Sequence, residues 1–323
     1  MLCSSISQLM RVLVTGAAGF VGRQVCEMLL DSGHLVIAAV RSPTVTRLDR
    51  AGLTHLCVGD LADSIDWRPI VQDVDAVVHL AAIAHRQHED EIAIFRTNVD
   101  VTRAIGAAVA LAGRRLVYVS SVKVHGDESR QGPFHEDDAF APEDSYGKSK
   151  VAAEAELRQL VHQCGLRLTV LRPPLVYGPE VKANFLALLR AVDAGWPLPL
   201  ANVRNRRSLI FVRNLADAIL RCLEAQHAIG RTFLVADGEP VSTSRLIRAL
   251  AEALGQSTRL IPFPPHFLEI AGALIGRGET VRRLTRSLEI DDSAIRQELG
   301  WQPPYTFEEG LRLTAEWYLA QRG

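Results

Sequence analysis

Three polar residues near the middle of the chain have types and spacing that suit proton transfer. Tyr146 and Lys150, in SYGKSK, are four residues apart and share one face of a predicted helix. A free tyrosine has a pKa of about 10, and an ammonium group one turn away favours the phenolate and lowers that pKa. Ser121, in SSVKVHG, ends a predicted strand that faces this helix, where its hydroxyl can bond a carbonyl or alkoxide oxygen. The alternative is an exposed Tyr–Lys pair without a catalytic role.

A glycine-rich turn at the start of the chain adds a phosphate-binding element. In TGAAGFVG, Gly16, Gly19 and Gly22 lie between a short apolar strand and an amphipathic helix. We expect Gly16 to allow the tight turn, Gly19 to let the backbone approach a pyrophosphate, and Gly22 to let the helix pack on the strand. The helix N-terminus then offers N–H groups and a partial positive charge. Unless this is a tight turn without a ligand, the chain binds a nicotinamide dinucleotide and transfers hydride between an alcohol and a ketone.

The end of the second predicted strand bears on which dinucleotide is bound. A carboxylate there would bond the ribose 2′-hydroxyl and repel a 2′-phosphate, but the strand ends at Val40 and Arg41 follows. Because an arginine can pair with a 2′-phosphate, the pattern favours NADP(H); NAD(H) remains possible if Arg41 is a solvated loop residue. Asp60, after the third predicted strand, is expected to accept a bond from the adenine amino group or else to cap a helix.

Apolar runs alternate with helical patterns through the first half of the chain, which predicts an α/β fold. We expect a Rossmann-type doubly wound parallel sheet with helices on both faces, and a smaller, mainly helical lobe over the carboxyl ends of its strands. The dinucleotide-binding domain is placed at 10–178 plus about 209–237, the substrate lobe at 179–208 plus about 238–323, and an N-terminal extension at 1–9. The apolar stretch 267–275 is too short to span a bilayer and is expected to be a core helix, or else to touch a membrane surface or a partner.

The order of these motifs resembles that of a known enzyme family. TGAAGFVG, GDLAD, HLAA, SSVKVHG, YGKSK and LRPPLVYGP follow one another as in the extended short-chain dehydrogenases/reductases, which include the NAD(P)-dependent sugar-nucleotide epimerases and dehydratases. The resemblance covers the chain from Met10 and implies that Ser121, Tyr146 and Lys150 are catalytic. It places Asn98 on a supporting helix behind them. The cofactor contacts that it implies, together with the turn, are Gly16, Ala18, Gly19, Phe20, Val21, Arg41, Asp60, Leu61, Leu80, Ala81, Ala82, Tyr146, Lys150 and Pro173.

The same resemblance implies a UDP-sugar substrate. Arginines suit a diphosphate because they form forked bonds to phosphate oxygens. The expected substrate contacts are Ser121, Lys123, Asn184, Arg207, Arg283 and Arg286, whereas Arg204 and Arg206 are expected to form a solvated rim.

The stretches RPPLVYGPEVKANF and RNRRSLIFV resemble a bacterial subgroup from surface-polysaccharide loci, including O-antigen loci. This implies NADPH-dependent 4-keto reduction of UDP-4-keto-6-deoxy-N-acetylglucosamine to UDP-N-acetylquinovosamine or its C4 epimer. The alternative enzyme is a UDP-hexose or UDP-N-acetylhexosamine 4-epimerase with bound NAD. An alternative from another class is a non-catalytic dinucleotide-sensing regulator, although such proteins usually lose the tyrosine or the lysine.

Composition and charge fit an ordinary globular protein. The 323 residues are 48% hydrophobic and 23% charged, with a net charge of −1, so no nucleic-acid partner and no stable membrane insertion are expected. The five cysteines are scattered without metal-ligand spacing, which predicts reduced thiols, no metal site and a cytoplasmic location. Family members pair two helices, here around 92–112 and 145–164, into a four-helix bundle, so the resemblance implies a homodimer.

Overall fold

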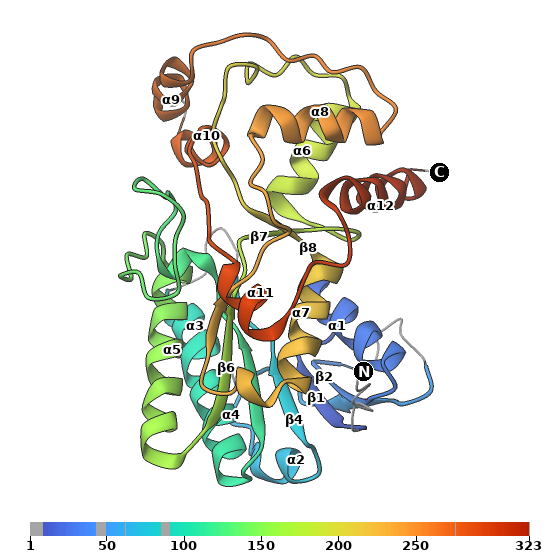
Figure 1. Ribbon diagram of the computed structural model, residues 1–323, viewed down its shortest axis with the longest axis vertical. Coiled ribbons are helices and arrows are strands. Elements are labelled where there is room, and N and C mark those ends of the chain that lie inside the picture. The colour runs from blue at the N-terminus through green and yellow to red at the C-terminus, as the bar shows by residue number, and fades with distance from the viewer. Residues whose placement is uncertain (1–8, 43–49, 62, 85–90, 275, 323) are drawn as a thin grey trace.

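The computed structural model describes residues 9–42, 50–61, 63–84, 91–274 and 276–322, so most of the predicted extension 1–9 lies outside the described residues. The described chain is built on a seven-stranded parallel sheet with strand order β3-β2-β1-β4-β5-β6-β9 (Figure 1). The strands are β1 (Arg11–Thr15), β2 (Leu35–Val40), β3 (Leu53–Cys57), β4 (Ala76–His79), β5 (Arg115–Val119), β6 (Arg167–Arg172) and β9 (Thr232–Leu234). The predicted α/β class and doubly wound sheet are therefore confirmed.

Helices cover both faces of this sheet, and the alternation of side chains along each strand explains why. In β1, Val12 and Val14 belong to one buried cluster and Leu13 to another, as expected when successive residues point to opposite faces. The first cluster includes residues of α1 (Phe20–Asp31), α7 (Val212–Glu224) and α11 (Ser293–Leu299). The second includes residues of α2 (Arg68–Gln72), α4 (Val101–Leu111) and α5 (Ser145–Cys164).

A second group of elements lies beyond the carboxyl ends of the strands. It has its own buried cluster, centred on Tyr177 and Phe211, and a two-stranded parallel sheet (Figure 1). The strand β6 ends at Arg172, directly before Pro173 and Pro174, since proline cannot donate to a sheet ladder, and the next strand pairs with β8 outside the main sheet. The elements are β7 (Leu175–Tyr177), α6 (Ala183–Asp193), β8 (Leu209–Phe211), α8 (Thr243–Ala253) and α12 (Phe307–Ala320).

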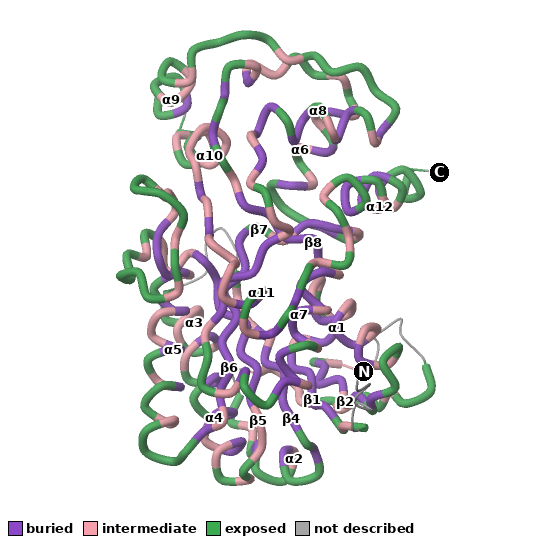
Figure 2. The backbone as a smooth tube through the Cα atoms, viewed as in Figure 1, coloured by how far each residue is buried: buried purple, intermediate pink, exposed green. Residues whose placement is uncertain are grey.

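The prediction of a core helix near 267–275 is wrong. The helix α9 (Pro265–Leu274) exists, but Phe267, Ile270 and Leu274 are 52%, 55% and 83% exposed (Figure 2). It packs on α10 (Gly278–Thr285), where Gly272 allows close approach of the Val281 side chain. An apolar composition indicated burial, but the side chain of this helix that packs against a main cluster is the partly buried Leu268. Shorter elements complete the chain: α3 (Glu91–Phe95), η2 (Arg96–Asp100), η3 (Val122–Val124) and η4 (Gln226–Ala228).

Candidate active site

The glycine turn has the geometry that its sequence predicts. Gly16 has a φ of +70°, and a Cβ there would lie 2.8 Å from the backbone nitrogen of Ala81; one on Gly22 would lie 2.1 Å from the Gly16 carbonyl oxygen. Gly19 caps α1 without a side-chain bond, and the first turn of that helix carries no acidic residue. The turn therefore leaves a helix N-terminus suited to an anionic pyrophosphate, and these residues fit a dinucleotide.

Most other predicted cofactor residues lie along the same edge of the sheet. They follow the carboxyl ends of β1, β3, β4 and β6, where open α/β sheets bind ligands. Those between β1 and α1, or in the first turn of α1, are Ala18, Phe20 and Val21; the others are Leu61, Leu80, Ala81, Ala82 and Pro173. Their contacts with a cofactor stay a prediction.

Arg41 and Asp60 form an ion pair with each other that the sequence did not indicate. Val40 ends β2 and is buried, so no carboxylate stands at that strand end. Arg41 Nη2 lies 3.1 Å from Asp60 Oδ2, and both side chains are exposed. A 2′-phosphate at Arg41 would therefore compete with Asp60.

The three predicted catalytic residues come together beyond the end of β5. Ser121 is buried just after β5, accepts a bond from the Lys123 backbone N–H at 3.3 Å, and donates one to Tyr146. Tyr146 and Lys150 lie on the first turns of α5, with Lys150 Nζ 5.8 Å from the Tyr146 ring centroid. Lys150 Nζ also donates to the Val119 carbonyl oxygen at 2.9 Å, which ties α5 to the strand end. The juxtaposition expected from the spacing is thus present.

Burial dominates the ionisation of this group. It raises the pKa of Tyr146 to about 12, a hydrogen bond from Ser121 lowers that pKa, and the charge of Asp144 raises it. Burial likewise lowers the pKa of Lys150 to about 7, and the nearby Glu154 carboxylate raises it. The expectation that Lys150 brings the tyrosine pKa below its ordinary value is wrong for the chain alone, because desolvation outweighs the other effects.

Asn98 supports the tyrosine from a π-helical turn that the sequence did not reveal. The buried Asn98 lies in η2, between α3 and α4, where one continuous α-helix was expected. Its Nδ2 donates to Ser149 Oγ at 2.9 Å, and Ser149 Oγ donates to the Tyr146 carbonyl oxygen at 2.8 Å. Its Oδ1 accepts from the Ile83 N–H at 2.8 Å. Single π-turns inside helices are frequent at functional sites, and apolar periodicity carries no signal for them.

His79 is a second supporting residue that sequence reasoning missed. It is fully buried at the end of β4, 2.6 Å from Thr15 Oγ1 and 2.9 Å from Thr102 Oγ1. Burial, and then the charge of Lys150, lower its pKa to about 3, so the ring is neutral at ordinary pH. In the motif HLAA, the family resemblance implies cofactor contacts only for the three residues that follow the histidine.

The structure brings only some of the expected substrate-binding residues close to one another. Arg207 is buried enough that its pKa is lowered to about 10, and the charges of Asp127 and Arg283 act on it. Arg283 pairs with Glu279, whereas Arg286 pairs with Glu128 at 2.9 Å and Glu269 at 3.1 Å. The other two are Lys123, which pairs with Asp127 and Asp144, and Asn184, exposed on the first turn of α6. Arg206 pairs with Glu289 and Arg204 is exposed, as expected for a rim.

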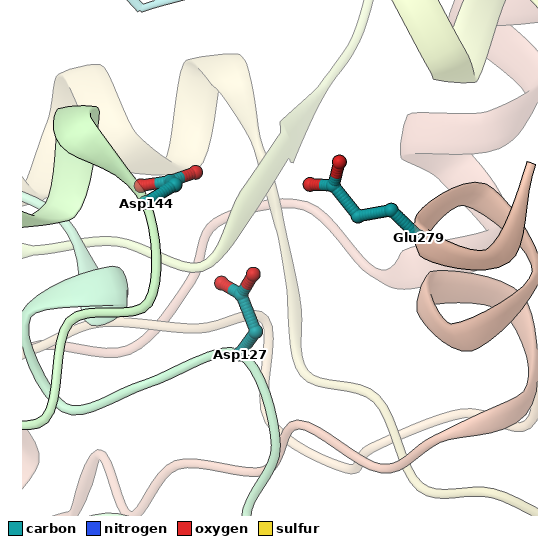
Figure 3. A group of neighbouring side chains, drawn as sticks. All are labelled: Asp127, Asp144 and Glu279. Carbon is teal, nitrogen blue, oxygen red and sulfur yellow. The ribbon is translucent and has the colours of Figure 1, made fainter. Parts of the chain in front are cut away.

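Three carboxylates converge where α10 meets the catalytic helix. Asp127, Asp144 and Glu279 reach in from the loop after η3, the start of α5 and α10 (Figure 3). Their closest oxygens all lie within 4.8 Å of one another. The ammonium of Lys123 pairs with two of them and Arg283 with the third, so the cluster is largely neutralised by cations of this chain.

The fold and these residues define a dinucleotide-dependent Rossmann enzyme with a Ser–Tyr–Lys group. Residues 12–236 match the NAD dependent epimerase/dehydratase family, and the chain belongs to that family. It is 38% identical to a UDP-glucose 4-epimerase of Vibrio cholerae over 95% of both chains. It is 30% identical to a dTDP-glucose 4,6-dehydratase of Xanthomonas campestris, over 96% of this chain and 93% of that one. The chain is thus an enzyme of the nucleotide-sugar epimerase/dehydratase class.

The fold also matches solved structures. A UDP-glucuronic acid 4-epimerase from Bacillus cereus, in complex with NAD, superposes with a TM-score of 0.80 at 21% identity, covering 97% of this chain and 100% of that one. This likeness concerns the fold. Among the described residues, no helix has the length and apolar content needed to cross a membrane.

Proposed function

We propose that this enzyme is a UDP-sugar 4-epimerase that uses NAD. The observation that carries the proposal is the Ser121–Tyr146–Lys150 group beside the glycine turn, at the sheet edge where a dinucleotide would lie. The 38% identity to a curated UDP-glucose 4-epimerase supports the reaction. The Arg41–Asp60 ion pair supports NAD, because the guanidinium that follows β2 among the described residues is already paired with a carboxylate.

The residues of the chain supply the acid–base part of such a reaction. When bound, the nicotinamide would accept a hydride from C4 of the sugar and return it to the opposite face. Tyr146 would take the proton of the C4 hydroxyl as the ketone forms and give it back at the end. Ser121 would hold the oxygen with its hydroxyl, and Lys150 would stabilise the phenolate. Because Asn98 and Ser149 fix the first turn of α5, Tyr146 is held in place throughout.

Arg207 and Arg283 are the proposed contacts for the diphosphate. Burial is the main reason that the pKa of Arg207 is lowered; the charge of Asp127 raises this pKa and the repulsion from Arg283 lowers it, so both charges lie within range of Arg207. An anionic diphosphate would relieve that repulsion and replace Glu279 as the partner of Arg283. Asn184 and Arg286 are secondary candidates in the same lobe.

Net reduction of a UDP-4-keto-6-deoxy-N-acetylglucosamine by NADPH is the second candidate. One observation favours it: β2 ends on the buried Val40, so no carboxylate repels a 2′-phosphate. The two reactions share the proton donor and differ in the fate of the hydride. In the reductase, NADPH is consumed and Tyr146 only donates its proton.

One experiment on the purified enzyme distinguishes the epimerase from the reductase. The dinucleotide released by acid is identified, and UDP-glucose and UDP-N-acetylglucosamine are incubated with the enzyme without added reductant. Formation of the C4 epimers, with NAD recovered, supports the epimerase, and Tyr146→Phe should then lose at least ~100-fold in turnover while still binding NAD. No epimer, with NADPH consumed on the 4-keto sugar, would overturn it in favour of the reductase. Full activity of Tyr146→Phe would remove the tyrosine from the chemistry.

We also propose a homodimer formed through α4 and α5. These helices pack side by side, and small or apolar side chains lie exposed or half-buried on their outer faces. They are Ala104, Ala107 and Leu111 of α4, and Ala152 and Ala155 of α5. Two such faces can form a four-helix bundle around a two-fold axis.

A further inference from the structure

Lys123 contacts Ser121 through its backbone and Asp144, at the start of the helix that carries Tyr146, through its side chain. Its backbone N–H donates to Ser121 Oγ at 3.3 Å, which leaves the serine hydrogen for Tyr146. Its ammonium pairs with Asp144, the residue that precedes α5.

Asp144 is the link between Lys123 and the tyrosine. Its Oδ1 accepts from the Gly147 N–H at 2.7 Å, which caps the helix one residue after Tyr146. Its negative charge raises the pKa of Tyr146. Burial raises the pKa of Asp144 itself, but the hydrogen bond from Lys123 lowers it and does so more strongly than the charge of Arg283. Asp144 is also crowded by Asp127 and Glu279 (Figure 3), so it needs a neutralising partner at short range.

We propose that Lys123 is a positioning residue for proton transfer: it neutralises Asp144 at the N-cap of α5 and thereby sets the orientation and the acidity of Tyr146. The proposal assigns the side chain to the enzyme's own carboxylates, in place of the predicted contact with substrate. It rests on the proposed role of Tyr146 as the acid–base group.

Removing the ammonium should raise the pKa of Tyr146. Without it, Asp144 keeps its charge among carboxylates, and a negative charge disfavours a nearby phenolate. Other charged or titratable groups around Tyr146 and Asp144 remain in place and do not change with this substitution. They are Tyr118 in β5, Asp127 after η3, Lys150 in α5, Arg207 before β8, and Glu279 and Arg283 in α10.

The test is a titration of the Tyr146 phenolate by ultraviolet difference absorbance in the NAD-loaded enzyme, where the positive charge of the oxidised nicotinamide would lower the phenolate pKa from its value in the chain alone. Each protein is measured against its own Tyr146→Phe counterpart, so that only this tyrosine contributes. Lys123→Met should raise the midpoint of the Tyr146 titration by on the order of one pH unit. This is the shift expected when the charge of Asp144 is no longer neutralised, at an effective dielectric constant of ~20. In the epimerase assay, the rise of kcat with pH should shift by the same amount, with KM little changed.

Two further variants separate this role from a merely structural one. Lys123→Arg keeps a cation for Asp144 and should restore the wild-type transition. Lys148→Met removes an exposed lysine from the same turn of α5 and should leave it unmoved. An unshifted or lowered transition in Lys123→Met, or an equal shift in Lys148→Met, would overturn the proposal. Because the absorbance titration needs no sugar, its outcome is independent of whether C4 epimerisation is found.

Discussion

At the scale of single residues, we expect the preference for NADPH or NADH to depend on the opposite charges of Arg41 and Asp60, which form an ion pair. Removing Arg41 takes away the guanidinium that follows directly after β2, whereas removing the charge of Asp60 leaves that guanidinium without this carboxylate. We expect Arg41→Ala to weaken NADPH binding about tenfold and NADH binding at most about threefold, because only NADPH has a 2′-phosphate to lose a charge-assisted bond. Asp60→Asn should move the NADPH/NADH ratio the opposite way. Fluorescence titrations measure both; equal losses for the two dinucleotides in Arg41→Ala would remove Arg41 from the 2′-phosphate site.

Lys150 should make the stability of the fold depend on pH. Its pKa is lowered from 10.5 to about 7 in the folded chain, so between those pH values the unfolded chain binds more protons. The contribution of Lys150 to the free energy of unfolding therefore rises as the pH increases from about 7 to 10.5. We expect the wild type to gain on the order of 1 kcal/mol over Lys150→Met between pH 7 and 9. Urea unfolding at the two pH values gives the comparison, and parallel changes in both proteins would contradict the lowered pKa.

At the scale of elements, a fully buried ion pair joins α5 to β6 beneath the catalytic residues. Arg172 donates to both carboxylate oxygens of Glu154, at 3.0 and 2.6 Å, and also to the Glu136 carbonyl oxygen at 2.7 Å. Glu154 lies one turn beyond Lys150 on α5. The pair therefore fixes the helix that carries Tyr146 and Lys150 to the sheet.

Breaking this pair should be costly. Glu154→Ala leaves a buried guanidinium without its carboxylate, and we expect a loss of ~3–5 kcal/mol in the free energy of unfolding. Glu156→Ala, two residues further along, breaks only a 3.9 Å contact with Arg103 at the surface and should cost less than ~1 kcal/mol. Urea unfolding measures both. Similar losses in the two variants would show that Arg172 finds another partner.

The same elements show what the sequence could and could not predict. The strands, the glycine turn and the helix with Tyr146 were predictable because alternation, glycine placement and helical spacing are local signals. The π-turn at Asn98 was not, because it changes the hydrogen-bond register without changing the apolar pattern. The exposure of α9 and the Arg41–Asp60 pair depend on which distant residues already occupy the core or a neighbouring loop. The contacts of Lys123 were missed for the same reason.

At the scale of the whole molecule, the exposed faces of α4 and α5 should decide the oligomeric state. We expect the wild type to be a dimer by light scattering at micromolar concentration, and Ala155→Arg to be a monomer, because a charged side chain would be buried at the two-fold axis. Gln256→Arg adds the same charge on an exposed loop after α8 and should leave the dimer intact. A monomeric wild type, or a dimeric Ala155→Arg, would contradict the four-helix interface.

The weak attachment of α9 and α10 has a consequence for how substrate enters and leaves. Among the described residues of the two helices only Gly272 is buried. The partly buried Leu268 and Leu284, two hydrogen bonds to the Leu284 carbonyl oxygen, and the ion pair of the following Arg286 with Glu128 connect them to the rest of the chain. A unit held in this way opens at low free energy without global unfolding. Its backbone amides should therefore exchange hydrogen for deuterium well before those of the sheet. Because Arg283 belongs to α10 and Arg286 follows it, such an opening would move the cations that we propose for the diphosphate while the seven-stranded sheet stays closed.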